Sequence, residues 1–139
     1  MTSSVIYEGD LRTTCVHLQS QSEMETDAPT DNQGKGERFS PTDLVGTALA
    51  SCMLTTMGIR AKELEPLIRN VKIDVEKIMS ANPRRISGLN LTFHYPDGFA
   101  ASPEQQAQLE QIAWTCPVKD SIHPDIALNV NFNWPVTQD

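Results

Sequence analysis

The sequence predicts an α+β domain in which antiparallel strands form two groups around one long central helix. Two observations favour this class. Apolar side chains at every second position indicate strands near the N-terminus, in the middle of the chain and at its C-terminal end. The run 44–59 carries no charged side chain and has the length of a helix. No internal repeat is present, and 139 residues suit a single domain over 1–139.

The first expected elements are two strands at the N-terminus that are joined across Gly9 and Asp10. In the second of them, Thr14, Val16 and Leu18 share the face that should meet the core. Residues 26–40 contain Pro, Asn, two Gly and mixed charge, which predicts a loop. Because too little chain precedes that loop to fold alone, we do not interpret it as a linker between domains.

The central helix is expected to begin at Pro41, with Ser40 as N-cap and Asp43 near the positive end of the helix dipole. It should run to about Leu64 and be stopped by Pro66. Such a helix spans roughly 36 Å, whereas a chain of this length has a radius of gyration of about 14 Å. A helix that is apolar all round must be covered on all sides. We therefore expect a second copy of the chain as the cover, in an obligate homodimer; the alternative is one chain that wraps the helix completely.

Two long strands should follow, with alternating apolar residues in 71–76 and 89–95 and the sequence "NPRR" as the turn between them. A second helix is expected to open at Ser102 with a capping box. Cys116 directly before Pro117 indicates the start of a new short helical turn. The stretch "DIALNVNFNW" closes the chain as a strand.

The composition excludes several classes of function. The net charge is −7, and no block rich in Lys and Arg is present to neutralise the phosphates of a nucleic acid. The N-terminus shows no basic region followed by an apolar one, so no secretory signal is expected. The run 44–59 is too short and too rich in Gly, Ser and Thr for a membrane span. The sequence therefore predicts a cytoplasmic protein that binds neither nucleic acid nor membrane.

Three cysteines at irregular spacing form neither a secreted disulfide framework nor a CxxC metal site. In the middle of an apolar helix, Cys52 is typical of a small buried side chain rather than a nucleophile. Cys116 precedes a Pro that opens a helical turn, where the helix dipole should lower a thiol pKa, and Lys119 should add to this. An ordinary N-cap residue is the alternative at Cys116. Position alone thus favours Cys116 as the reactive thiol.

Arg12 lies on the core-facing side of the second expected strand, so it needs an anionic partner such as a thiolate or a carboxylate. The alternative is that Arg12 lies at the mouth of the hairpin and reaches water. Arg38, in the loop before the helix, is the other candidate cation. Cys15 and His17 share the opposite face of the strand, but a metal site there would need further ligands, and none is near in sequence. We therefore expect no metal.

The stretch "FSPTDLVGTALASCMLTTM", followed later in the chain by "CPVKDSI", resembles the OsmC/Ohr family of osmotically inducible and organic hydroperoxide resistance proteins. The preceding "TDAPTDNQGKGE" is similar to the OsmC-like branch. The resemblance implies an intertwined homodimer with two active sites at the subunit interface and no cofactor. It also implies that Cys52 is the peroxidatic thiol, that Cys116 is the resolving thiol and that Arg12 stabilises the thiolate.

The peroxidases of that family commonly have a Glu directly after the helix-opening Pro, and this Glu binds the arginine. Here the position is Thr42, and Asp43 is the nearest carboxylate that could be the partner. The leading hypothesis is a thiol-dependent peroxidase that reduces organic hydroperoxides through Cys52 and Cys116 and is recycled by a dithiol reductant. The alternatives are a non-catalytic dimer that binds a small apolar ligand and a redox sensor whose disulfide alters a partner surface.

Overall fold

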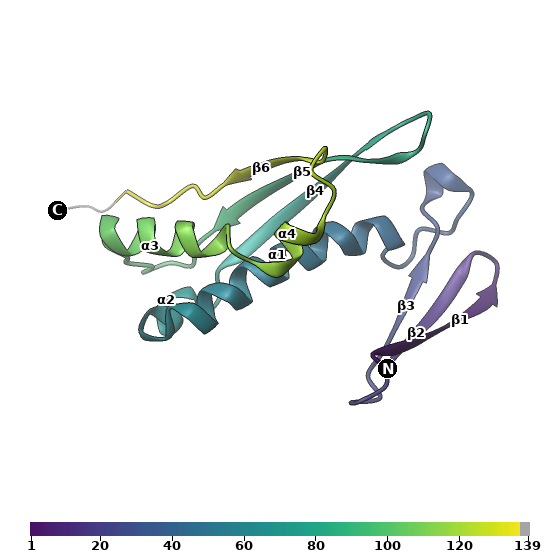
Figure 1. The fold of residues 1–139 in the computed structure, drawn as a ribbon, viewed down its shortest axis with the longest axis horizontal. Helices are drawn as coiled ribbons and strands as arrows, with labels where there is room; N and C mark the ends of the chain where they lie inside the picture. Colours follow the sequence, from purple (N-terminus) through teal and green to yellow (C-terminus); the bar gives the residue numbers. More distant parts are fainter. Residues whose placement is uncertain (137–139) are drawn as a thin grey trace. The chain divides into compact units, whose positions relative to one another are not determined.

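The computed structural model describes residues 1–136 and divides into two compact units, Met1–Val45 and the chain from Gly46 onward. Each unit contains one three-stranded sheet (Figure 1). Along the chain, the helices come after β3 and again between β5 and β6. The long helix α1 begins in the first unit and continues into the second. The predicted α+β class is confirmed.

In the first unit, β1 (Ser3–Gly9), β2 (Arg12–His17) and β3 (Glu23–Asp27) form an antiparallel sheet in that order. The expected hairpin is present, and its turn places Asp10 and Leu11 in the left-handed region. β3 was not predicted, since its second half lies in what was expected to be a loop. Four of its five residues are polar or charged, so its strand conformation depends on pairing with β2 rather than on an apolar pattern.

The segment between β3 and α1 contains a short 3₁₀ turn, η1 (Thr30–Asn32). Just after it, a Cβ at Gly34 would lie 1.8 Å from the carbonyl oxygen of Ala28, so only glycine fits there. The N–H of Asp27 donates to the carbonyl oxygen of Phe39, 3.1 Å away, and ties the end of this segment back to β3. The segment is thus an ordered loop folded against the sheet of its own unit.

Helix α1 (Pro41–Arg60) begins where the sequence predicts. Ser40 and Asp43 form a reciprocal cap: the N–H of Asp43 donates to Ser40 Oγ at 3.1 Å, and the N–H of Ser40 donates to Asp43 Oδ2 at 2.9 Å. The cap satisfies two backbone donors that the first turn would leave unpaired.

The end of the central helix differs from the prediction. The chain leaves the helical conformation at Ala61 (φ −120°, ψ 64°) and continues as η2 (Lys62–Leu64) and α2 (Glu65–Ile68). Pro66 does not stop a helix but lies in the first turn of α2. A proline is tolerated there because an N–H in the first turn has no partner within the helix.

In the second unit, β4 (Lys72–Ser80), β5 (Arg85–His94) and β6 (Ala127–Asn131) form a sheet in that order. β4 and β5 are antiparallel, as expected, but β6 runs parallel to β5, which corrects the prediction of purely antiparallel strands. The reason lies in the connection. The chain passes through α3 (Pro103–Ala113) and α4 (Pro117–Ser121) before β6, and such a crossover brings a strand back in the same direction.

The core of the second unit lies on one face of this sheet. Along β5, Leu89, Leu91 and Phe93 are fully buried, while the residues between them are partly exposed. α1 packs on this face with one stripe of buried residues, at Gly46, Leu49, Ala50, Met53, Thr56 and Met57. A Cβ at Gly46 would lie 3.0 Å from side-chain atoms of both Leu89 and Val75, so glycine permits the close approach of α1 to β4 and β5.

α3 begins with the predicted capping box between Ser102 and Gln105. Its C-terminal half is tied to the segment after β6, where Trp134 Nε1 donates to Glu110 Oε2 at 3.0 Å. Tyr95, stacked on Trp134, donates its hydroxyl to the carbonyl oxygen of Phe132 at 2.6 Å. Burial, together with the charge of Glu110, raises the pKa of Tyr95 well above its usual range. These contacts fix the helix that leads into Cys116.

The helix that contains the run 44–59 is longer than that run, and by length and composition alone the 20 residues of α1 pass as a candidate membrane span. Core helices of water-soluble proteins pass the same test. The buried stripe of α1 is that of a helix packed on a sheet.

Candidate functional site

Cys52 lies in the middle of α1 and is partly exposed. Its Sγ is 3.9 Å from Oγ1 of Thr56, one helical turn later, which is within hydrogen-bonding range for sulfur. Thr56 is buried, so its hydroxyl is a fixed polar neighbour of the thiol. Thr56 was not among the predicted site residues, although the spacing of four along a helix places the two side chains side by side.

Cys116 is the N-cap residue of α4 and is completely buried, with 0% of its surface exposed. Burial is the largest cause of its pKa shift and raises the pKa of the thiol; the neighbouring Cys52 raises it further. Hydrogen bonds from the backbone at Lys119 and Val118 act in the opposite direction. The net shift is upward, so the prediction of a low pKa at Cys116 was wrong. The N-terminus of this five-residue helix does not outweigh the loss of water around a buried thiol.

The structure brings Cys52 and Cys116 together. Cys52 lies near enough to Cys116 to be one of the causes that raise the pKa of the Cys116 thiol, and both thiols are free. One thiol comes from the middle of α1 and the other from the connection between α3 and α4, all within the second unit. Two neighbouring free thiols can form a disulfide, and a sulfenic acid on one can be attacked by the other.

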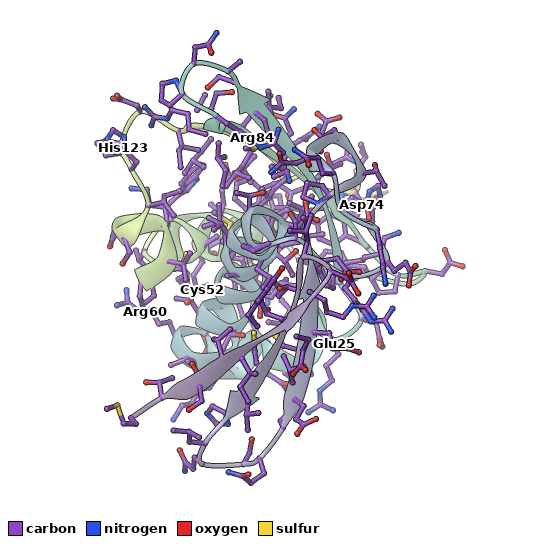
Figure 2. The ribbon with its side chains drawn as sticks, turned by 90° about the vertical axis from the view of Figure 1, so that its right-hand side faces the viewer. Glu25, Cys52, Arg60, Asp74, Arg84 and His123 are labelled. Carbon is purple, nitrogen blue, oxygen red and sulfur yellow. The ribbon has the colours of Figure 1, made fainter. Side chains whose placement is uncertain are left out.

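A second contact joins the same two segments. Arg60, the last residue of α1, donates from Nη1 to Oγ1 of Thr115 at 3.0 Å, and Thr115 directly precedes Cys116. Cys52 and Arg60 lie along one helix (Figure 2). Neither Arg60 nor Thr115 was singled out in the sequence, because their contact depends on how α1 packs against the end of α3.

Arg12 lies in the first unit, where it binds Asp27 with two hydrogen bonds: Nε to Oδ1 at 2.7 Å and Nη2 to Oδ2 at 2.8 Å. Only 1% of the Asp27 side chain is exposed. The hydrogen bond from Arg12 is the largest cause that lowers the pKa of Asp27. An anionic partner was predicted for Arg12, but Asp27 takes that place, and the described contacts of Asp43 are those of the helix cap. The prediction missed Asp27 because it missed β3, in which Asp27 stands opposite Arg12.

Two further carboxylates surround the same guanidinium. Arg12 Nη2 lies 3.4 Å from Glu37 Oε2, and Arg12 Nη1 lies 3.7 Å from Glu25 Oε2. The N–H of Glu37 also donates to Asp27 Oδ2 at 3.2 Å, so the loop before α1 contributes to the same network. Arg38, the other candidate cation, binds Glu25 at 3.4 Å and is more exposed.

The remaining candidates do not form a metal site. Cys15 Sγ lies 3.9 Å from Thr13 Oγ1, and His17 Nδ1 lies 2.6 Å from Ser20 Oγ. Within residues 1–136, no group of three or more His, Cys, Asp or Glu side chains is arranged to hold a metal ion.

A groove of about 460 Å³ borders α4 in the second unit. Its walls combine apolar and charged side chains, from Lys119, Asp120, Ile122, His123, Pro124, Ile126 and Leu128. The volume lies within the range of small-molecule sites in proteins.

Comparisons with known proteins point to the family that the sequence resembles. The sequence matches the family model described as OsmC-like protein over residues 34–131. A search of curated proteins finds no match. A solved structure of a candidate osmotic-stress-induced and detoxification-response protein from Psychrobacter arcticus 273-4 is 50% identical, with 94% of each chain covered and a TM-score of 0.88.

More distant structures share the fold. One is an organic hydroperoxide resistance protein, OsmC, from Legionella pneumophila, with 16% identity, 94% of this chain and 96% of that chain covered, and a TM-score of 0.70. Another is the organic hydroperoxide resistance protein OhrB of Bacillus subtilis, with 16% identity, coverage of 94% and 97%, and a TM-score of 0.59. At this level of identity the two structures show the fold alone.

Proposed function

Because the chain belongs to the OsmC-like protein family, we propose that it is a thiol-dependent peroxidase that reduces organic hydroperoxides. The observation that carries the proposal is a pair of free thiols, Cys52 and Cys116, that lie near enough for Cys52 to raise the pKa of Cys116. It is supported by two structures of the same fold that are named organic hydroperoxide resistance proteins. The Psychrobacter protein, named for osmotic stress and detoxification, agrees with a role of this kind.

In the first step, Cys52 attacks the hydroperoxide. It is the thiol of the pair that is partly exposed, whereas Cys116 is fully buried. The Cys52 thiolate takes the distal oxygen, the O–O bond breaks, and the alkoxide gains a proton and leaves as an alcohol. Cys52 becomes a sulfenic acid. The neighbouring hydroxyl of Thr56 is placed to donate a hydrogen bond to the thiolate.

In the second step, Cys116 attacks the sulfenic acid. An S–S bond forms, the S–O bond breaks, and the oxygen leaves as water with the protons of the sulfenic acid and the Cys116 thiol. The backbone hydrogen bonds at Lys119 and Val118 favour the thiolate that Cys116 must form. A dithiol reductant then restores both thiols by thiol–disulfide exchange. No metal or other cofactor takes part in these steps.

Arg12 is part of the proposal as the cation that stabilises the Cys52 thiolate. Asp27 supports such a role because a buried carboxylate with two hydrogen bonds fixes the orientation of the guanidinium. In this arrangement Asp27 supplies the carboxylate that the family's peroxidases commonly have after the helix-opening Pro. Thr42 at that position therefore does not deprive Arg12 of a carboxylate partner.

We also propose that the protein is a homodimer. The side of α1 opposite its buried stripe leaves Ala48, Ser51, Thr55 and Ile59 exposed, and a second copy is the cover that fits a helix of this composition. In the first unit, β1 likewise exposes the apolar side chains of Val5, Ile6 and Tyr7. A cytoplasmic location fits the reduced thiols that the mechanism requires.

A second candidate function is the non-catalytic binding of a small apolar ligand. The groove beside α4 favours it, because its volume suits a small molecule and four of its lining residues are apolar. A redox sensor would share the thiol chemistry but not the turnover. Both candidates are separated from the peroxidase by the rate of reaction with a hydroperoxide.

The test is the reaction of the reduced protein with one equivalent of cumene hydroperoxide, followed by mass spectrometry of the thiols. The wild type should form a Cys52–Cys116 disulfide. Cys116→Ser should leave a trappable sulfenic acid on Cys52, and Cys52→Ser should not react. Cys15→Ser is the matched control and should behave as the wild type. A bridge that includes Cys15, or no reaction at all, would contradict the proposal and leave the binding function in its place.

A further inference from the structure

One face of α1 carries both Cys52 and the contact that holds the connection bearing Cys116. Cys52, Thr56 and Arg60 follow one another at intervals of four residues, so they lie along the same side of the helix. Thr56 contacts Cys52, and Arg60 binds Thr115. Arg60 at one end of this row thus binds Thr115, and Cys52 at the other end lies near enough to Cys116, the next residue, to raise its pKa.

The hydroxyl of Thr115 is held from two sides. It donates to the carbonyl oxygen of Ile112 at 2.6 Å, and it accepts from Arg60 Nη1 at 3.0 Å. A hydroxyl group has one proton to donate, so these two contacts fix the direction in which it points. The N–H of Thr115 also donates to the carbonyl oxygen of Ile112, 2.9 Å away. The residue before Cys116 is therefore tied both to the last turn of α3 and to the end of α1.

We propose that Arg60 and Thr115 form a clip that positions Cys116 for disulfide formation with Cys52. The proposal rests on the peroxidase function above and concerns only its second step. Formation of an S–S bond requires the two sulfurs to approach to about 2 Å, with the two Cα atoms about 4.4–6.8 Å apart. The clip joins the backbone just before Cys116 to the helix that carries Cys52, and so it restricts the separation of the two Cα atoms.

Arg60 acts as a positioning residue and not as the cation that stabilises the Cys52 thiolate. Eight residues of α-helix separate it from Cys52, a rise of about 12 Å. Its guanidinium is bound to Thr115, and Arg60 is not among the groups that shift the pKa of Cys116. Loss of the clip should therefore slow disulfide formation and leave the first attack on the hydroperoxide unchanged.

The clip is tested with Arg60→Ala and with the pair Thr115→Val and Thr115→Ser. Stopped-flow fluorescence separates the oxidation of Cys52 from disulfide formation, because Trp114 lies two residues before Cys116. Arg60→Ala and Thr115→Val should slow the second phase roughly three- to tenfold, the effect of one hydrogen bond, while Thr115→Ser restores it. The double variant Arg60→Ala/Thr115→Val should be no slower than Thr115→Val, because that substitution already removes the contact with Arg60.

Arg69→Ala is the matched control. Arg69 is also an exposed arginine, and it binds Glu65 of α2 rather than Thr115, so its removal changes the net charge equally. This variant should show both phases at the rates of the wild type. Equal slowing in Arg69→Ala, or additive effects of the two clip variants, would overturn the proposal.

A second measurement does not depend on any hydroperoxide. The reduced protein is equilibrated with oxidised dithiothreitol, which forms the Cys52–Cys116 disulfide by exchange and is itself reduced. The equilibrium constant should fall by the same three- to tenfold in Arg60→Ala and Thr115→Val but not in Thr115→Ser. If the wild type does not react with hydroperoxide, the proposed function fails while this equilibrium still decides on the clip. Equilibrium constants equal to that of the wild type in both Arg60→Ala and Thr115→Val would overturn the proposal of the clip. If Arg60→Ala does not fold, the comparison of Thr115→Val with Thr115→Ser decides.

Discussion

The exposed side of α1 gives the sharpest test of the proposed homodimer. Ile59 is the only large apolar residue of α1 that is exposed, with 63% of its surface accessible. Full burial of an Ile side chain contributes about 1.5–3 kcal/mol, so the remaining 63% corresponds to about 1–2 kcal/mol for each subunit. In a two-fold symmetric dimer both copies of Ile59 contribute, about 2–4 kcal/mol together. That energy corresponds to a factor of roughly 30 to 1,000 in the dissociation constant.

Ile59→Ala should remove most of this energy, and Ile59→Asp should weaken the dimer further by placing a charge in an apolar interface. Sedimentation velocity over a range of protein concentrations measures the dissociation constant. The melting temperature should also rise with protein concentration, because an obligate dimer has no stable folded monomer. Val136→Ala is the control, since Val136 is an exposed apolar residue that is not on α1. A folded wild-type monomer at low micromolar concentration, or an unchanged dissociation constant in Ile59→Asp, would refute the reasoning.

Three further predictions follow from the contacts of single side chains. Arg12→Ala and Asp27→Asn should both slow the oxidation of Cys52 by cumene hydroperoxide. Thr42→Glu should change this rate by no more than about twofold, because Asp27 already binds Arg12. A wild-type pH–rate profile in Arg12→Ala would contradict the role of Arg12. Thr56→Val should slow the same oxidation by up to about tenfold through loss of the hydroxyl, with Thr56→Ser as the control that should react at the wild-type rate. The free energy of unfolding of the reduced protein in urea should be constant below about pH 8.5 and fall above it. Burial raises the pKa of Cys116 in the folded state, so the unfolded state loses this proton first as the pH rises. Cys116→Ala should show a smaller fall, and an equal fall in both proteins would count against a buried neutral thiol.

Those parts of the fold that depend on local patterns are predictable from the sequence. Alternating apolar residues indicate β4 and β5, and the side chains of Ser102 and Gln105 mark the start of α3. Both signals act between residues that are close in the chain or repeat at a fixed interval. The direction of β6 carries no such signal, because it depends on the crossover through α3 and α4.

The same distinction between local sequence patterns and long-range packing applies to the residues of the site. Position in the sequence pointed to Cys116 and a family resemblance pointed to Cys52, and in the structure Cys52 is near enough to raise the pKa of Cys116. Asp27 was missed, because β3 forms a strand through pairing with β2 and lacks an apolar pattern of its own. Arg60 and Thr115 were missed for a similar reason: both are common surface residues, and only the packing of α1 against the end of α3 brings them together.

The order proposed for the two thiol steps rests on the burial of the thiols rather than on the helix dipole. Position in the sequence favours Cys116 as the attacking thiol, since it precedes the first turn of α4. In the structure that thiol is fully buried and its pKa is raised, so it is protonated and shielded when a hydroperoxide arrives in solution. Cys52 is partly exposed and can be reached first. Once Cys52 carries a sulfenic acid, its neighbour no longer needs access to solvent, because the group to be attacked already lies beside it. In the proposed mechanism, burial of Cys116 would therefore protect this thiol from direct oxidation and still allow it to form the disulfide, as a two-cysteine peroxidase requires.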